Sequence, residues 1–112
     1  MSDLLQLISE FKDVELLALI TDSSSEVIFY CRIDDRIYQS NDLVENGLYD
    51  GNKMEDLYQK ITGAIRNAEK FRGGMLNIVK IDKANNISYQ YVPQDSGCFK
   101  IRREWKSTLS FK

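Results

Sequence analysis

Histidine is absent from the 112 residues of this sequence. Because histidine is the commonest general base and metal ligand, its absence excludes Ser-His-Asp and Cys-His catalytic arrangements. The two cysteines, Cys31 and Cys98, are 67 positions apart, and their spacing supports neither a zinc site nor a thioredoxin-like site. The six glycines form neither a phosphate-binding loop nor a dinucleotide fingerprint. The sequence therefore lacks the residue patterns that these common classes of enzyme require.

Neighbouring carboxylates at Asp34–Asp35 and Glu55–Asp56 are the remaining candidates for acid–base chemistry. Paired acids at a turn or in the first turn of a helix usually serve the local backbone. The acidic residues within 34–50 also lack the spacing of an EF-hand calcium loop. We therefore expect no enzymatic activity, no bound metal and no cofactor.

Long apolar runs are missing as well. The longest, Leu16 to Ile20, is far below the roughly 18 to 20 residues that cross a bilayer. The first residues contain no basic region followed by an apolar stretch, so the sequence predicts no secretory signal. A lone pair of cysteines in such a chain favours buried thiols over a disulfide. We expect a cytoplasmic protein without a membrane partner.

Hydrophobic residues make up 43% and charged residues 29%, which is typical of a folded globular protein. One domain over residues 1–112 is expected, of the α+β class. Apolar periodicity predicts an antiparallel sheet of four to five strands, a long central helix, and short N- and C-terminal helices. The expected strands are 14–21, 26–33, 36–39, 75–81 and 87–92, and the expected helices are 3–12, 53–71 and a segment that begins near 98.

The stretch 40–52 shows no clear periodicity and is predicted to be a long loop. Loops of this length in compact domains are uncommon and tend to be functional. It carries the acidic residues Asp42, Glu45 and Asp50, with Tyr49 as an aromatic residue suited to an interface. The helix after it is expected to be capped by Asn52 and to end before Gly73.

The net charge of −2 conceals an uneven distribution. Residues 1–56 hold 13 acidic and 4 basic side chains, whereas residues 57–112 hold 4 acidic and 11 basic ones. Either the two halves neutralise one another across the fold, or the N-terminal half forms an acidic surface that steers a basic partner. The sequence pI near 5.1 argues against nucleic-acid binding, although basic and aromatic residues alternate within 99–106.

Several segments in order resemble the YezG-like family of bacterial immunity proteins. They are VIFY at 27–30, the amphipathic helix, NIV at 77–79, the tyrosine strand ISYQY at 87–91, and REWK at 103–106. The resemblance covers about residues 26–109. The sequence departs from the family at 92–95, where VPQD replaces the acidic cluster that often follows the tyrosine strand.

This resemblance implies a cytoplasmic antitoxin that binds and blocks a cognate protein toxin, often a nuclease. Nuclease clefts are basic, so an acidic surface of the inhibitor covers them in place of phosphate. The toxin-binding candidates are Asp34, Asp35, Asp42, Glu45, Tyr49 and Asp50.

A type III secretion chaperone, which binds an effector segment as a homodimer, is the alternative. A monomer favours the antitoxin and an obligate homodimer favours the chaperone; we expect a monomer. A small enzyme of unfamiliar type would require a deep pocket that contains carboxylates with perturbed pKa values.

Overall fold

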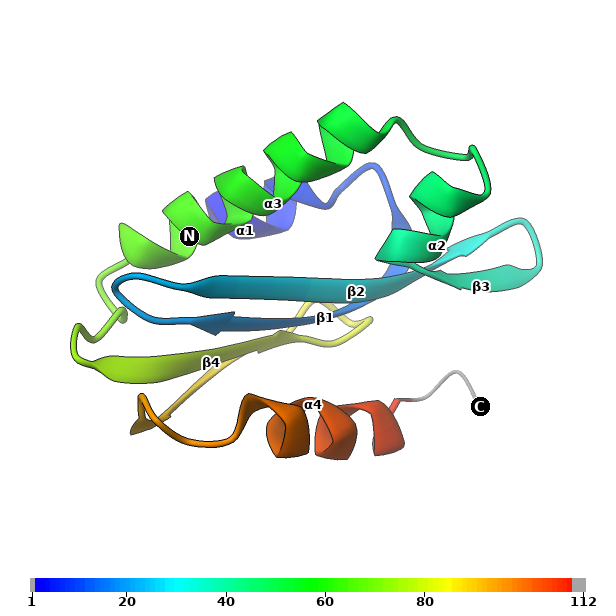
Figure 1. Cartoon of the computed structure of the whole chain (residues 1–112). Helices are drawn as coiled ribbons and strands as arrows, with labels where there is room; N and C mark the ends of the chain where they lie inside the picture. Colours follow the sequence, from blue (N-terminus) through cyan, green and yellow to red (C-terminus); the bar gives the residue numbers. More distant parts are fainter. Residues whose placement is uncertain (1, 110–112) are drawn as a thin grey trace.

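A five-stranded antiparallel sheet in the order β3-β2-β1-β4-β5 forms the centre of the protein. The computed structural model describes residues 2–109, and side chains from Leu4 onward. Three helices cover one face of the sheet and the fourth covers the other (Figure 1). The predicted α+β class is confirmed. In chain order the elements are α1 (Ser2–Leu7), β1 (Lys12–Ile20), β2 (Ser25–Ile33), β3 (Arg36–Gln39), α2 (Ser40–Glu45), α3 (Gly51–Arg66), β4 (Met75–Ile81), β5 (Ile87–Pro93) and α4 (Cys98–Ser107).

The central strand β1 is buried on both faces, as its unbroken apolar run predicts. Leu16, Ala18 and Ile20 contribute to the core beneath α1, α2 and α3. Leu17 and Leu19 contribute to a second core beneath α4. Alternating side chains of one strand therefore serve two separate cores.

The C-terminal helix α4 closes the second core with the only tryptophan of the chain. Trp105 is 5% exposed, and its ring centroid lies 5.9 Å from that of Tyr30 on β2. Arg102 forms an ion pair with Glu26, also on β2. Although α4 follows β5 in the chain, it returns beneath β1 and β2.

None of the helices among residues 2–109 is long and apolar enough to cross a membrane.

The stretch 40–52 is not a long loop, so that prediction is wrong. Ser40–Glu45 forms the two-turn helix α2, and α3 begins at Gly51, so only residues 46–50 connect the two helices. Leu43 is fully buried and holds α2 against the body. A six-residue helix with one fully buried apolar side chain is too short to show helical periodicity in the sequence.

Helix boundaries also differ from the predictions. The first helix ends at Leu7 rather than near residue 12, because the next N–H groups donate to carbonyls three residues earlier and tighten the chain. Asp50, not Asn52, caps α3: its Oδ1 accepts the Lys53 N–H at 3.0 Å.

The central helix α3 ends at Arg66, five residues before the predicted end at 71. The buried Asn77 of β4 holds the segment that follows. Its Oδ1 accepts the Arg72 N–H at 2.8 Å, and its Nδ2 donates to the Arg72 carbonyl at 2.9 Å. These bonds hold the chain at Arg72, beyond the predicted end of the helix. At the observed end, the Ala68 N–H donates to the Ile65 carbonyl three residues earlier, which tightens the last turn.

Candidate functional acidic surface

The predicted acidic residues lie on three segments that meet at one end of the molecule. These segments are the β2–β3 turn, α2, and the connection that leads into α3. Figure 1 shows them at the same end of the fold. We call this surface the acidic end, and all of its carboxylate side chains are exposed. Its members are Asp34, Asp35, Asp42, Glu45 and Asp50.

Local backbone requirements place the two aspartates of the turn. Ile33 pairs with Arg36, so Asp34 and Asp35 are the two central residues of a tight hairpin. Asp34 has a φ of 56°, a left-handed conformation that aspartate tolerates better than most residues. Both carboxylates are therefore held at the tip of the hairpin, away from the sheet.

Helix α2 presents Asp42 and Glu45 because its other side is fixed to the protein. Leu43 and Ser40 are both fully buried. The Ser40 Oγ accepts a hydrogen bond from the Tyr58 hydroxyl at 2.8 Å and lies 3.4 Å from the Phe29 backbone nitrogen, which donates to it. With these contacts on the inner side, the acidic residues of the helix point to solvent.

Tyr49 is packed against the body and is only partly available to a partner. Its ring centroid lies 5.3 Å from that of Phe11, and its hydroxyl donates to Glu10 Oε2 at 3.0 Å. The predicted aromatic anchor is thus already part of the structure that supports the acidic end.

Two further carboxylates, Glu10 and Asp56, lie near Tyr49 and were missed by sequence reasoning. Burial raises the pKa of the Tyr49 phenol, and Glu10, Asp50 and Asp56 raise it further by their charge. Glu10 is 39 positions from Tyr49, and no local pattern relates the two. The sequence explained Asp56 only as an acidic residue in the first turn of a helix. Its exposed ion pair with Lys60 is weak.

The negative field of this end also reaches the edge of the second core. Burial raises the pKa of the Tyr30 phenol, and the charge of Asp42 raises it further. Exposed carboxylates of this kind suit ion pairing with a basic surface. Among residues 2–109, no group of three or more His, Cys, Asp or Glu side chains is arranged to hold a metal ion.

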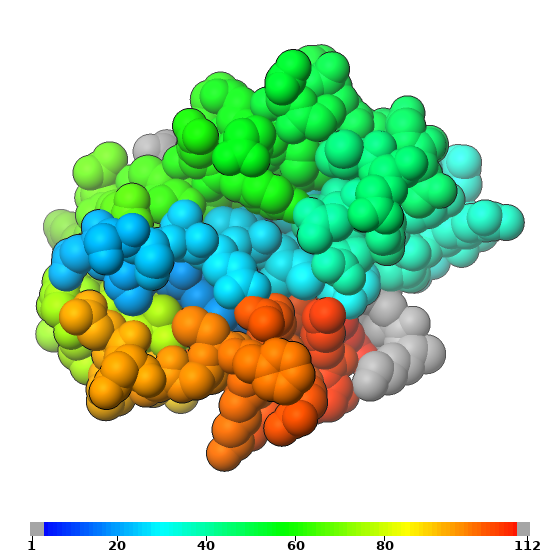
Figure 2. All heavy atoms as spheres, in the orientation of Figure 1, coloured from blue at the N-terminus to red at the C-terminus, as the bar shows by residue number. Residues whose placement is uncertain are grey.

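The order of the strands separates the strands of the two differently charged halves of the chain. Strands β1, β2 and β3 from the acidic half form one side of the sheet, and β4 and β5 from the basic half form the other. Two helical parts of the basic half cross back to the acidic strands. One is α4, which Figure 2 shows in orange and red on the side opposite α3, and the other is the part of α3 after residue 56, which packs on β1 and β2. The halves therefore do not interleave strand by strand, and the acidic end remains distinct.

Comparisons with protein-family models, with curated proteins and with solved structures found no match.

Proposed function

We propose that this chain is an immunity protein of the YezG-like kind, which binds a basic protein toxin in the cytoplasm and neutralises it. The observation that carries the proposal is the gathering of exposed carboxylates from three segments at one end of the fold. The resemblance along residues 26–109 supports the same function. A nuclease domain is the proposed class of toxin.

The charge distribution supplies the mechanism. A basic nuclease cleft attracts phosphate, and a rigid acidic surface attracts the same cleft from a distance. The turn, the buried side of α2 and the capped start of α3 each fix one part of the acidic end. Because local contacts fix the backbone that carries these carboxylates before binding, little backbone entropy is lost when the toxin docks.

The test compares association rates with the protein encoded by the adjacent gene, the candidate toxin. The variant Asp34→Asn/Asp35→Asn/Asp42→Asn removes three charges, and asparagine retains the tolerance for the left-handed conformation at position 34. We expect association at low salt to slow by about tenfold and its dependence on salt concentration to weaken.

The matched control removes three exposed carboxylates from the other half of the chain: Glu69→Gln/Asp95→Asn/Glu104→Gln. It changes the net charge equally and is expected to alter the rate by less than about twofold. Equal slowing by both variants would assign the effect to net charge and remove the acidic end as the interface. If the adjacent gene product does not bind at all, the immunity function is wrong.

A further inference from the structure

Strand β2 has an outer edge that is only half covered. On that side β3 pairs with Tyr30 to Ile33, and its last paired residue is Gln39. The chain then turns into α2, whose Ser40 Oγ accepts the Phe29 N–H. Within residues 2–109, no strand lies beside Ser25–Ile28 on this edge.

The register shows which backbone groups lie along the open edge. In an antiparallel strand, the N–H and C=O of one residue both point to the neighbour on one side, and those of the next residue point to the other side. The Phe29 N–H points outward to Ser40, so the N–H and C=O groups of Val27 and Ser25 point outward as well. No group among residues 2–109 pairs with them, so Val27 and Ser25 present donors and acceptors in the geometry of a β-ladder.

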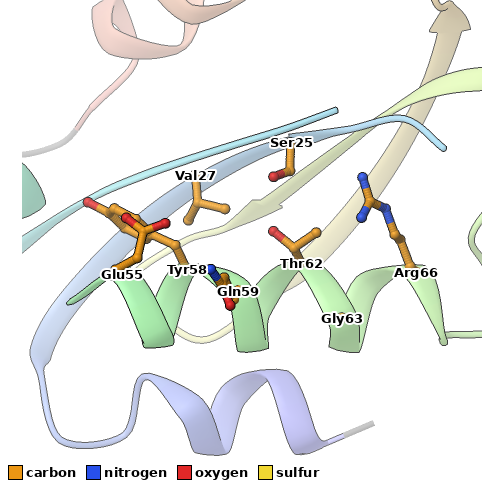
Figure 3. A pocket seen from close by; sticks show the side chains of 8 residues that line it. All are labelled: Ser25, Val27, Glu55, Tyr58, Gln59, Thr62, Gly63 and Arg66. Atoms are coloured by element: carbon orange, nitrogen blue, oxygen red, sulfur yellow. The ribbon is translucent and has the colours of Figure 1, made fainter. Parts of the chain in front are cut away.

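Helix α3 forms the second wall of a groove of about 420 Å³ along this edge. Figure 3 shows Thr62 and Arg66 pointing from the helix toward Ser25 and Val27 of β2. Gly63 lies in the same wall, and a Cβ placed on it would meet no atom within 4 Å. A glycine within a helix destabilises it by about 0.5–1 kcal/mol relative to alanine, and here its missing side chain widens the groove.

Opposite charges lie at the two ends of this groove. Glu55 and Arg66 both line it and are 11 residues apart on α3, about 16 Å along the helix axis. Five residues of β-strand span about 17 Å, so the distance matches a short strand. Arg66 is held at the start of β2 by 3.0 Å hydrogen bonds to the Thr21 and Ser24 carbonyls. Neither charge is part of an ion pair that the described residues form.

We propose that this groove accepts an extended segment of the protein partner as an additional strand, antiparallel to β2. The inference rests on the proposed protein-binding function and adds a second contact to it. A segment in this direction lies in line with β3 and runs the same way, because β3 ends where the open edge begins. The segment then carries a basic side chain near Glu55 at its start and an acidic side chain near Arg66 at its end.

Synthetic peptides test the groove on the isolated protein, without the toxin. The probe is the acetylated and amidated hexapeptide Lys-Thr-Val-Thr-Val-Asp, titrated into the ¹⁵N-labelled protein at millimolar concentration. We expect the amide resonances of Ser25, Val27 and Gly63 to shift, and amide exchange at Val27 to slow. The charge-reversed peptide Asp-Thr-Val-Thr-Val-Lys is expected to bind about three- to tenfold more weakly. Lys-Thr-Pro-Thr-Pro-Asp, which lacks two donors, is expected not to bind.

Two variants with the same new side chain locate the site. Gly63→Trp fills the groove and is expected to abolish the shifts, whereas Lys60→Trp, at an exposed position outside the groove on the same helix, is expected to preserve them. Thermal unfolding of both variants verifies that they remain folded.

Any of the following results with the peptides would overturn the inference: no shifts with any peptide, shifts at Tyr89 on the opposite edge strand, or equal binding of the two charge arrangements. Shifts that depend on protein concentration without peptide would assign the edge to a second copy and overturn it too. A groove that fails this test leaves the toxin-binding proposal standing, because that proposal is measured separately through the adjacent gene product.

Discussion

At the scale of single residues, burial determines the chemistry of the potentially reactive side chains. Cys31 is fully buried and Cys98 is partly buried, and both are free thiols, as the sequence predicts. Burial raises the pKa of the Cys31 thiol from its ordinary value of 9.0 to about 11. The thiolate is the reactive form, so Cys31 is expected to be inert near neutral pH.

The raised pKa of Cys31 predicts a pH-dependent stability. A raised folded-state pKa means that the unfolded state ionises first, so the stability present below pH 9 is lost as the pH rises toward 11. We expect the free energy of unfolding in urea to fall more steeply over this range for the wild type than for Cys31→Ala. Tyrosines with raised pKa values, such as Tyr58 and Tyr89, affect both proteins equally. Parallel curves would contradict the prediction.

At the scale of elements, α3 combines a buried stripe with a glycine that faces open space. Met54, Leu57, Ile61 and Ile65 are buried and form the apolar stripe that a helix of this periodicity requires. Gly63 lies outside that stripe and lines the groove beside β2. The helix therefore tolerates change at Gly63 that it would not tolerate on its buried side.

Replacement of this glycine by alanine is expected to stabilise the protein. Gly63→Ala adds a methyl group where no atom lies within 4 Å and reduces the entropy of the unfolded chain. We expect the free energy of unfolding to rise by about 0.5–1 kcal/mol, measured by urea denaturation. The matched control Gly47→Ala meets equally open space but has a φ of 71°, so it is expected to destabilise the protein. A loss of stability in Gly63→Ala would contradict the open groove.

At the scale of the whole molecule, both faces of the sheet are covered by the chain's own helices. The large hydrophobic side chains that remain exposed among residues 2–109 are Leu48, at 46%, and Phe99, at 65%. They lie on different segments, the α2–α3 connection and α4, and isolated exposed apolar residues are normal on protein surfaces. Arg102 and Arg103 lie within 6 Å of the Phe99 ring, at 5.7 and 5.3 Å, as cation–π partners.

This surface predicts a monomer. We expect light scattering coupled to size-exclusion chromatography to give a mass of 13.0 kDa that does not change with concentration. A stable homodimer buries a large and mostly apolar area, for which two separate side chains are insufficient. A mass of twice that value at all concentrations would favour the secretion-chaperone alternative over the immunity protein.

Local patterns in the sequence are sufficient to predict the elements that have a regular hydrophobic period. Alternating or continuous apolar runs predicted four strands and allowed the short fifth at 36–39, and apolar residues at helical spacing predicted the long helix, because these patterns follow from the period of each structure. The sequence did not determine α2, whose stability comes from Leu43 in the core and from Ser40 against Tyr58, contacts made between distant segments. Nor did it determine the end of α3, where the Ala68 N–H donates to the Ile65 carbonyl three residues earlier.

The acidic end and the groove beside β2 also differ in how much of each the sequence could predict. The acidic residues were visible in the sequence, but only the strand order separated them from the basic half and brought the three segments to one end. The groove beside β2 had no sequence signal, since it exists because β3 covers four residues of a nine-residue strand. Strand length and hydrophobic period follow from neighbouring residues in the sequence. Whether the edge of a strand is covered depends on which element lies beside it in space.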